Sequence, residues 1–385
     1  MTLPLENQIR AAFAAERANM QKVTDPDQIP PDFECISNAW LTAHLCKAVP
    51  GAEVVGHSLG EPDEGTNNRR RILLQYNEAG AAAGLPSSIF AKATNGLRNR
   101  LMLAHSGAIH CEVTFYREVR DGITFETPRA FHAAYDPHSF NSIILLEDLG
   151  DSAFLDLTSH GSPDLMRRQL SLLARLHASG FGGAGMASRL TNLPSWKTRF
   201  SALMQVNLEK ACTDGLAVCR DRIPADLWDR RAEIWPVTVA SLDFEASTGP
   251  TLCHGDVHLH NWYFRPDGTL GISDWGVTHI GPWGRDLAYC LVAGLPVDVR
   301  RSHEDELMQH YLDALVGNGG PAITLDEART ACKSGIMTAL AFWTMTAAPV
   351  AEMPDMQPAD TALAFVERLA AAVSDWKALD FEQAP

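Results

Sequence analysis

The spacing of apolar residues changes near Gly150, and this change restricts the folds that the chain can adopt. Before Gly150, apolar residues cluster in short runs at 52–59, 69–76 and 87–94, with glycine- and proline-rich turns between them. Short apolar runs bounded by turn residues predict β-strands. After Gly150, apolar residues recur every three or four positions, as in amphipathic helices. We therefore expect an α+β protein with a small antiparallel sheet and a larger, mainly helical region.

The same reading places individual elements along the chain. Residues 107–119 carry an apolar stripe that predicts one helix within the strand-rich region, whereas 128–136 and 142–150 return to strand character. The segment 163–180 begins with Pro-Asp and ends with Gly, which are helix start and stop signals. Residues 262–275 contain Pro-Asp-Gly between two short β runs and predict a hairpin. Further helices are predicted at 38–49, 194–218, 222–246, 301–316, 324–347 and 358–378.

Composition excludes some functions and limits the number of lobes. A chain of 385 residues is long for a single hydrophobic core, so we expect two or three lobes. Its formal net charge of −15 argues against a nucleic-acid or anionic-membrane surface, because both reward clustered lysine and arginine. We expect a small-molecule ligand and neither a nucleic-acid nor a membrane partner; the sequence leaves the oligomeric state open.

The cysteines and the chain's apolar stretches bear on its location. None of the eight cysteines forms a Cys-x-x-Cys pair, so the sequence suggests neither a zinc ribbon nor a redox dithiol. Buried free thiols in a reducing compartment are expected instead. The first residues lack the apolar core of a signal peptide, and residues 336–351 are too short and too threonine-rich to span a bilayer. A cytoplasmic protein is therefore expected.

The segment "TLCHGDVHLHNWYF", residues 251–264, concentrates polar side chains between apolar flanks. One interpretation is a zinc site, because His254 and His258 are four residues apart and would share one face of a helix. However, Gly255 and the hairpin that follows favour a loop, and Asp256 is the only further ligand type nearby. A loop that presents Asp256 and Asn261 to a substrate is the alternative.

Six motifs in order resemble those of the protein-kinase-like small-molecule phosphotransferases, which include the aminoglycoside phosphotransferase and choline kinase families. They are "FAKAT", "EVTFYREV", "IILLEDL", "LLARLHA", "HGDVHLHN" and "SDW". The resemblance covers most of the chain, from about residue 36 to beyond residue 290. Residues 38–60 and 111–119 look closer to the ecdysteroid-kinase-like branch. The resemblance implies a bilobal fold with a sheet-containing N-lobe and a helical C-lobe.

The resemblance also implies domains and a cofactor set. Residues 1–49 would form an N-terminal helical segment, and 50–149 a nucleotide-binding lobe. Residues 150–385 would form a helical lobe with the catalytic loop and an acceptor pocket. ATP and Mg²⁺ are the implied cofactors.

Three residues of the helical region match the family's catalytic positions. Asp256 would be the catalytic base, since a hydroxyl that attacks a phosphate must lose its proton to a nearby acceptor. Asn261 and Asp274 would be the magnesium ligands, because this cation prefers oxygen donors and is coordinated by phosphate oxygens as well as by the protein. His254 would prop the loop from below.

The resemblance places the nucleotide on the strand-rich region. Lys92 ends an apolar strand, where a lysine is costly without a partner. Glu112 is the proposed partner, with Glu118 as an alternative on the same helix; the pair would hold the α- and β-phosphates. Glu147, Asp148 and Leu149 would form the hinge, where backbone groups meet the adenine.

Two further positions are open. The glycines of residues 56–65 do not form a Gly-x-Gly-x-x-Gly loop, so backbone amides near 65–68 are the candidate phosphate contacts. Asp286 follows "GPWG", and a helix N-cap explains it; the resemblance instead implies that it braces the catalytic loop. Tryptophans and methionines of the late helices, such as Trp343, are expected in the core or beside an acceptor.

We therefore expect an ATP-dependent phosphotransferase that acts on a hydroxyl of a small molecule. An aminoglycoside, an amino alcohol, or a lipophilic alcohol such as a steroid are the acceptor classes considered. One alternative is a catalytically inactive relative that senses a nucleotide or metabolite. Another is a metal-dependent hydrolase built on the histidine-rich segment.

Overall fold

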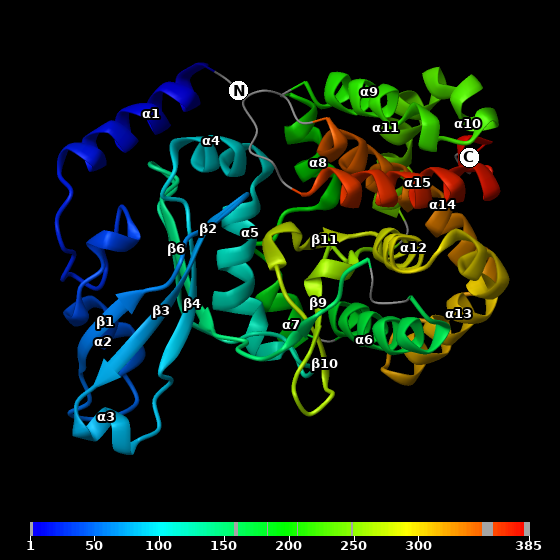
Figure 1. The fold of residues 1–385 in the computed structure, drawn as a ribbon. Helices are drawn as coiled ribbons and strands as arrows, with labels where there is room; N and C mark the ends of the chain where they lie inside the picture. Colours follow the sequence, from blue (N-terminus) through cyan, green and yellow to red (C-terminus); the bar gives the residue numbers. More distant parts are fainter. Residues whose placement is uncertain are drawn as a thin grey trace. The chain divides into compact units, whose positions relative to one another are not determined.

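The protein combines helices and sheets in two compact units (Figure 1). The computed structural model describes residues 3–157, 161–182, 184–205, 207–247, 249–348 and 357–380. The first unit, here the sheet unit, comprises the described residues within 1–120 and 128–151. The second, here the helical unit, comprises those within 121–127 and 152–380. The predicted α+β class is confirmed.

The sheet unit contains an antiparallel sheet in the order β1-β3-β4-β6-β5, with β2 paired to the first residues of β3. Every predicted strand is present, with boundaries that differ by a few residues. Two irregular pairings, one in β1 and one in β5, shift the register at the outer strands. The strands are β1 Val54–Leu59, β2 Asp63–Glu64, β3 Asn68–Tyr76, β4 Ser88–Ala93, β5 Ala130–Tyr135 and β6 Ser142–Glu147.

Helices cover this sheet and extend from it. The predicted helix over 107–119 is confirmed, but its second half is a π-helical turn, Phe115–Val119. The short helix α4 was not predicted, because arginines and an asparagine interrupt its apolar stripe. The helices are α1 Leu3–Ala18, α2 Asn38–Leu45, α3 Glu78–Ala82, α4 Leu97–Ser106 and α5 Ala108–Thr114.

The two faces of β4 differ, because one packs into the hydrophobic core and the other carries Lys92. Ile89, Ala91 and Ala93 pack into a hydrophobic core with Trp40 of α2. Since successive side chains of a strand point to opposite faces, Lys92 lies on the other face and meets α5. The central strand therefore joins the core of the unit to a buried charge.

A buried arginine ties the N-terminal helix to the rest of this unit. Arg100 of α4 is fully buried and donates to the Thr94 carbonyl oxygen. It also forms an ion pair with Glu16 of α1 at 2.6 Å, and its guanidinium lies over the ring of Phe13. Residues 3–18 are thus a docked part of the sheet unit.

The helical unit begins with two short sheets around the polar segment. One has the order β10-β9-β7 and contains the predicted hairpin; the other pairs β11 with β8. The strands are β7 Ala153–Phe154, β8 Thr251–Cys253, β9 Trp262–Phe264, β10 Leu270–Ile272 and β11 His279–Gly281.

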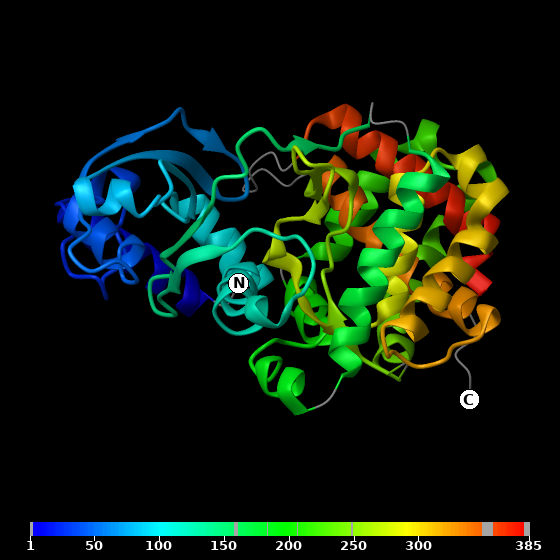
Figure 2. The same ribbon diagram turned by 90° about the horizontal axis from the view of Figure 1, so that it is seen from below.

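Long helices form the remainder of this unit (Figure 2). The single helix predicted over 194–218 is two helices, because Asn207 adopts a positive φ of 67° before α9. The prediction over 222–246 likewise divides into α10 and α11. The helices are α6 Pro163–Phe181, α7 Ala184–Arg189, α8 Trp196–Met204, α9 Leu208–Val218, α10 Ala225–Asp229, α11 Arg231–Ser247, α12 Trp283–Gly294, α13 Val297–Gly317, α14 Leu325–Ala347 and α15 Ala359–Asp375.

Helix α12 is the central helix of the unit, and every one of its residues is buried. It crosses α14 closely, because a glycine lies at the crossing on each helix. A Cβ on Gly284 would come within 2.6 Å of the Ala331 Cβ, and one on Gly335 within 2.4 Å of the Arg285 Cα. This close packing fixes α12 beneath the polar segment.

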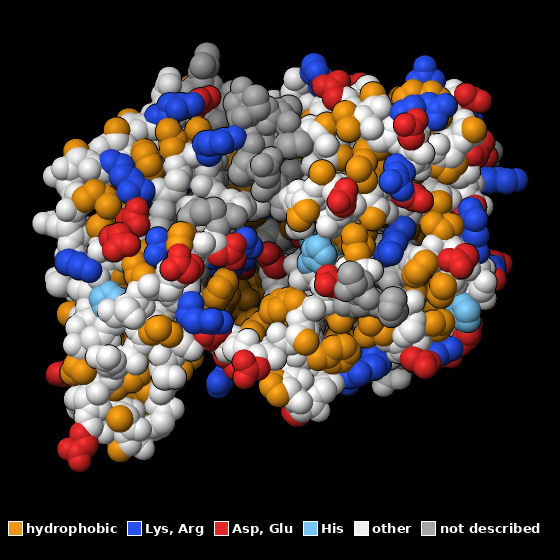
Figure 3. Space-filling view, in the orientation of Figure 1, with side chains coloured by type: hydrophobic (Ala, Val, Ile, Leu, Met, Phe, Trp, Pro, Cys, Tyr) orange, Lys and Arg blue, Asp and Glu red, His pale blue; other side chains and the backbone are white. Residues whose placement is uncertain are grey.

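Charges of both signs are interspersed on the face drawn in Figure 3. No helix among the described residues is long and apolar enough to cross a membrane.

Candidate active site

The polar segment is a loop, as predicted, and leaves β8 through a sharp turn at Gly255. Gly255 has a φ of +84°, a conformation that L side chains rarely adopt. A Cβ at this position would lie 2.5 Å from the Val277 carbonyl oxygen and 3.0 Å from the His279 ring. The loop ends in a short turn, Leu259–Asn261, from which β9 begins. Only glycine allows this path.

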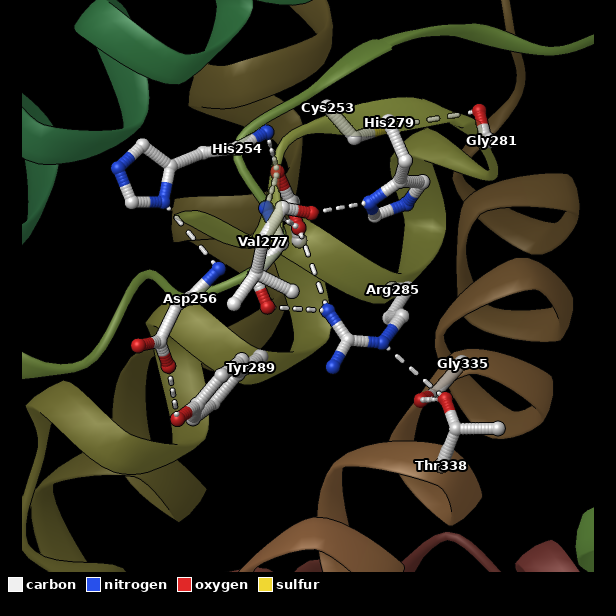
Figure 4. Close-up of polar contacts among 12 residues, drawn as sticks. Cys253, His254, Asp256, Val277, His279, Gly281, Arg285, Tyr289, Gly335 and Thr338 are labelled. Atoms are coloured by element: carbon white, nitrogen blue, oxygen red, sulfur yellow. Dashed lines mark hydrogen bonds and ion pairs between the residues drawn. The ribbon is translucent and has the colours of Figure 1, made fainter. Parts of the chain in front are cut away.

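Two neighbouring residues of α12 hold the peptide groups on either side of Gly255 (Figure 4). The Asp286 carboxylate accepts from the backbone N–H groups of His254, at 2.7 Å, and Gly255, at 3.0 Å. Arg285 donates to the Gly255 carbonyl oxygen at 2.6 Å. The N-cap role for Asp286 is wrong, since α12 begins at Trp283 after Pro282 and Asp286 lies inside its first turn. Its carboxylate faces the loop instead.

His254 is part of the support of the loop. One ring nitrogen accepts from the Asp256 backbone N–H at 3.2 Å, and the other lies 3.0 Å from the Ser273 carbonyl oxygen. Burial lowers the pKa of this histidine. Both ring nitrogens of His254 are thus engaged within the protein, and this argues against a zinc site formed by His254 and His258.

A second group of metal-ligand types lies below the loop. Among the described residues, His177, Cys253 and Asp286 have ligand atoms within 4.8 Å of one another. The Tyr311 hydroxyl lies 2.7 Å from His177 Nδ1, His177 Nε2 lies 3.5 Å from Asp286, and Cys253 Sγ donates to the Gly281 carbonyl oxygen. Each of the three residues therefore has a contact within the protein.

Asp256 lies at the bend of the loop with its side chain about 30% exposed. Three donors surround its carboxylate: the Tyr289 hydroxyl at 3.1 Å, the Asn261 amide nitrogen at 3.2 Å, and His258 Nε2 at 3.4 Å. Burial alone would raise the pKa of this carboxyl group, but His258, His254 and Tyr289 lower the pKa to about 2. The group is a carboxylate at neutral pH.

Asn261 and Asp274 are brought to the same place by Ser273. The Ser273 N–H donates to the Asn261 carbonyl oxygen at 2.8 Å, and Asp274 follows directly. Asp274 adopts φ 64° and ψ 75°, a left-handed conformation that is uncommon for a residue other than glycine. Strain of this kind is typical of functional positions. The structure thus places Asp274 one residue from the backbone contact with Asn261, whose amide group contacts Asp256.

The donor set at this place fits magnesium. The Asn261 amide nitrogen faces Asp256, so the amide oxygen of Asn261 points to the other side. Asp274 supplies a carboxylate. Oxygen atoms of an amide and a carboxylate are the ligands that this hard cation prefers. No soft ligand stands among the three assembled residues.

In the sheet unit, Lys92 and Glu112 form the predicted ion pair. Lys92 Nζ lies 2.6 Å from Glu112 Oε1, and both side chains are less than a tenth exposed. Lys92 therefore lies inside the sheet unit and does not face solvent. The structure thus places Glu112, the first proposed partner, at hydrogen-bond distance from Lys92.

The predicted hinge residues follow directly on β6. The Glu147 N–H donates to the Arg129 carbonyl oxygen at 2.8 Å, so this group is already used within the unit. Asp148 forms an ion pair with Arg71 at 2.6 Å and accepts from the Ser88 hydroxyl at 2.7 Å. The Asp148 side chain is thus structural, and backbone groups beyond Glu147 are what the segment offers an adenine. Leu149 lies next to them.

The loop expected to cover phosphates is shaped by α4. Asn99 donates to the carbonyl oxygens of Gly65 and Thr66 at 2.7 and 2.8 Å. The Gly65 N–H donates to the Asn67 carbonyl oxygen, so this particular amide is engaged within the loop. The sequence analysis missed Asn99, because α4 itself was not predicted.

Sequence reasoning also missed Tyr289 and Trp343 as neighbours of Asp256. Trp343 Nε1 lies 2.5 Å from the Tyr289 hydroxyl oxygen, which in turn contacts Asp256. Both residues lie in apolar helical stretches, far along the chain from the loop. Their patterns are those of core residues, and no motif marks them.

Comparisons with known proteins agree with this fold. No curated protein matches the chain. A microcompartment-associated aminopropanol kinase of known structure is 12% identical, covers 85% of this chain and 95% of its own, and gives a TM-score of 0.51. Spectinomycin phosphotransferase APH(9)-Ia is 13% identical, with 89% and 99% covered and a TM-score of 0.47. The choline kinase LicA from Streptococcus pneumoniae is 12% identical, with 84% and 94% covered and a TM-score of 0.45.

A family model described as "Phosphotransferase enzyme family" matches residues 84–323, more than half of the chain. The predicted resemblance is therefore confirmed at the level of the superfamily, whereas the ecdysteroid-kinase-like branch stays a prediction. The matched range contains both Lys92 and Asp274. The chain belongs to the phosphotransferase enzyme family.

Proposed function

We propose that this protein transfers the γ-phosphate of ATP to a hydroxyl group of a small molecule. The observation that carries the proposal is the setting of Asp256. Its carboxylate is partly exposed, ionised, and surrounded by donors that fix its direction. Membership of the phosphotransferase family supplies the reaction class.

In the proposed reaction, the acceptor oxygen forms a bond to the γ-phosphorus while the bond from that phosphorus to the β,γ-bridging oxygen breaks. The electron pair of the broken bond stays on ADP. The acceptor proton passes to a carboxylate oxygen of Asp256 and from there to solvent. The products are ADP and a phosphorylated acceptor.

The low pKa of Asp256 suits a particular form of base catalysis. A carboxyl group with a pKa of about 2 is a weak proton acceptor. It can still orient the acceptor hydroxyl by accepting its hydrogen bond and can take the proton late, once the bond to phosphorus is forming. This matches a loose transition state, in which positioning and neutralisation of charge matter most.

Asn261 and Asp274 are the proposed magnesium ligands. The bound cation would neutralise charge on the phosphate oxygens. The left-handed backbone at Asp274 holds this carboxylate beside the loop that carries Asn261. Both residues thereby keep their oxygen donors near the proposed base.

Lys92 is the proposed contact to the α- and β-phosphates. Its ion pair with Glu112 holds the ammonium group in one direction within a buried site. Backbone groups beyond Glu147, in residues 148–149, are proposed to bind the adenine. AMP and GDP are named as bound molecules in structures of two fold neighbours, the LicA kinase and an aminoglycoside 2′-phosphotransferase.

The proposed acceptor class is a small hydroxylated molecule, with amino alcohols tested first. The net charge of −15 favours a cationic acceptor over an anionic one. Fold neighbours are named for choline, ethanolamine, aminopropanol and spectinomycin. Lipophilic alcohols such as steroids form the second test group.

The experiment is a screen for ADP formation from MgATP over a panel of hydroxylated compounds, with the Asp256→Asn variant as blank. We expect ADP formation to rise above the slow hydrolysis by water only with particular acceptors, and only with the unmodified protein. Nucleotide binding with no turnover on any acceptor would favour a sensor. Hydrolysis of substrates without nucleotide, lost on metal chelation, would favour a metal-dependent hydrolase.

A further inference from the structure

We propose that Tyr289 and Trp343 are positioning residues that aim the Asp256 carboxylate. This inference rests on the proposed role of Asp256 as the base. Tyr289 comes from α12 and Trp343 from α14, the two helices that pack closely beneath the loop. Their polar atoms form a chain from the indole nitrogen through the phenol to the carboxylate.

The direction of each hydrogen bond in this chain is fixed by chemistry. An indole N–H can only donate, so the Tyr289 oxygen accepts from Trp343. The phenol proton must then point elsewhere, and an ionised carboxylate can only accept. Tyr289 therefore donates to Asp256 Oδ1 at 3.1 Å (Figure 4). The reverse arrangement would require the indole nitrogen of Trp343 to accept a hydrogen bond, which it cannot do.

Packing holds both rings in place. Tyr289 and Trp343 are 2% and 4% exposed. The Trp343 ring packs against Phe365 of α15, with 4.5 Å between ring centroids, and meets the His258 ring edge-on at 5.5 Å. A hydroxyl group in such an apolar setting is costly unless it is bonded on both sides. Phenylalanine would fill the same space, so the hydroxyl itself calls for an explanation.

The hydrogen bonds from Trp343 through Tyr289 position the Asp256 carboxylate but do not relay its proton. Tyr289 cannot accept the proton that Asp256 takes from the acceptor, because Trp343 already donates to the phenol oxygen. Its pKa is also held well above the usual value, by burial first and by the neighbouring Asp256. The chain secures Oδ1, while Asn261 and His258 lie against Oδ2. The plane of the carboxylate is thus set from both sides.

The test uses hydrolysis of radiolabelled MgATP, with water in place of the acceptor hydroxyl. For both Tyr289→Phe and Trp343→Phe we expect kcat to fall roughly 10- to 100-fold, because misplacing a reacting group costs about this much. The KM for MgATP should stay unchanged. Tyr263→Phe is the matched control: its hydroxyl is also buried and bonded to a carboxylate, that of Glu126, but it does not contact Asp256.

The same comparison in the Asp256→Asn background separates positioning from general support of the fold. If Tyr289 acts through Asp256, adding Tyr289→Phe to Asp256→Asn will not slow hydrolysis further. A further fall of the same size, or a Tyr289→Phe rate equal to that of the unmodified protein, would overturn the positioning role. If Asp256→Asn alone keeps the full rate, the proposed role of Asp256 as the base is wrong. The positioning role of Tyr289 and Trp343, which rests on it, is then wrong as well. Trp343→Phe provides an independent reading if Tyr289→Phe does not fold.

Discussion

Asp286 accepts a hydrogen bond from the backbone N–H of Gly255 at 3.0 Å and thereby joins the buried helix α12 to the turn that carries Asp256. The turn needs a positive φ, and the space beside it is filled by Val277 and His279. Conformation and contact therefore constrain Gly255 separately, and a matched pair of variants can tell these constraints apart.

Gly255→Ala should be more destabilising than Gly268→Ala. Both glycines have a φ above +80°, but a Cβ on Gly268 meets nothing within 4 Å. The left-handed conformation alone costs alanine about 1–2 kcal/mol. We expect Gly255→Ala to lower the free energy of unfolding by more than this and to reduce turnover, as urea titrations and ADP assays would measure. Equal losses in both variants would mean that the loop adjusts.

Lys92→Met should destabilise the sheet unit by about 3–5 kcal/mol, because it leaves the Glu112 carboxylate buried without its cation. The double variant with Glu112→Leu should recover most of this loss and still bind nucleotide weakly. Arg10→Met is the control, since its ion pair with Glu6 is exposed and should contribute less than 1 kcal/mol. Urea titration and binding of a fluorescent nucleotide would check both effects; tight binding by the double variant would contradict the role given to Lys92.

Asp274→Asn should weaken nucleotide binding only when magnesium is present. Asparagine tolerates the left-handed conformation at this position, so the backbone should keep its path. We expect affinity for MgATP to fall roughly tenfold or more as a charged ligand is lost, with unchanged affinity for ATP in a chelator. Titrations with and without magnesium would measure this difference. A loss that is equal in both conditions would remove Asp274 from the metal site.

His279 should make the protein less stable in acid. Burial lowers the pKa of this fully buried ring from about 6.5 to about 3. Between these values the unfolded chain takes up a proton that the folded protein does not, so stability rises with pH and is lost as pH falls below about 6.5. The contribution between pH 7 and pH 5 should be about 2 kcal/mol.

The matched variants for this prediction are His279→Asn and His138→Asn. Asparagine can still donate to the Val277 carbonyl oxygen that lies 2.8 Å from His279 Nδ1. Unfolding in urea at pH 7 and pH 5 should show a smaller pH dependence for His279→Asn. The exposed His138 serves as the site of the control substitution. An unchanged slope for His279→Asn would show that the proton is taken up in the folded state as well.

The sequence predicted those parts of the site whose partners are near in the chain or lie on a regular element. Lys92 and Glu112 were paired correctly because a lysine in an apolar strand requires a partner, and the family resemblance marks Glu112 on a predicted helix. Asp256 and Asn261 lie within one loop, so their spacing alone brings them together.

Tyr289 and Trp343 were out of reach for a physical reason. Tyr289 contacts Asp256 and Trp343 contacts Tyr289 because α12 and α14 cross at glycines, which is a property of tertiary packing. Asp286 was open to two interpretations because a helix start explains an aspartate as well as a distant loop does. The direction of the Asp286 side chain decides between the two interpretations, and this direction cannot be predicted from the pattern of apolar residues.

The most direct test of the account is mass spectrometry of acceptors incubated with MgATP and either the unmodified protein or Asp256→Asn. The account predicts that one class of hydroxylated compound gains a single phosphoryl group, in step with ADP formation, and that Asp256→Asn produces neither. Phosphorylated product at equal rates from both proteins, or no product from any acceptor although MgATP binds, would contradict it.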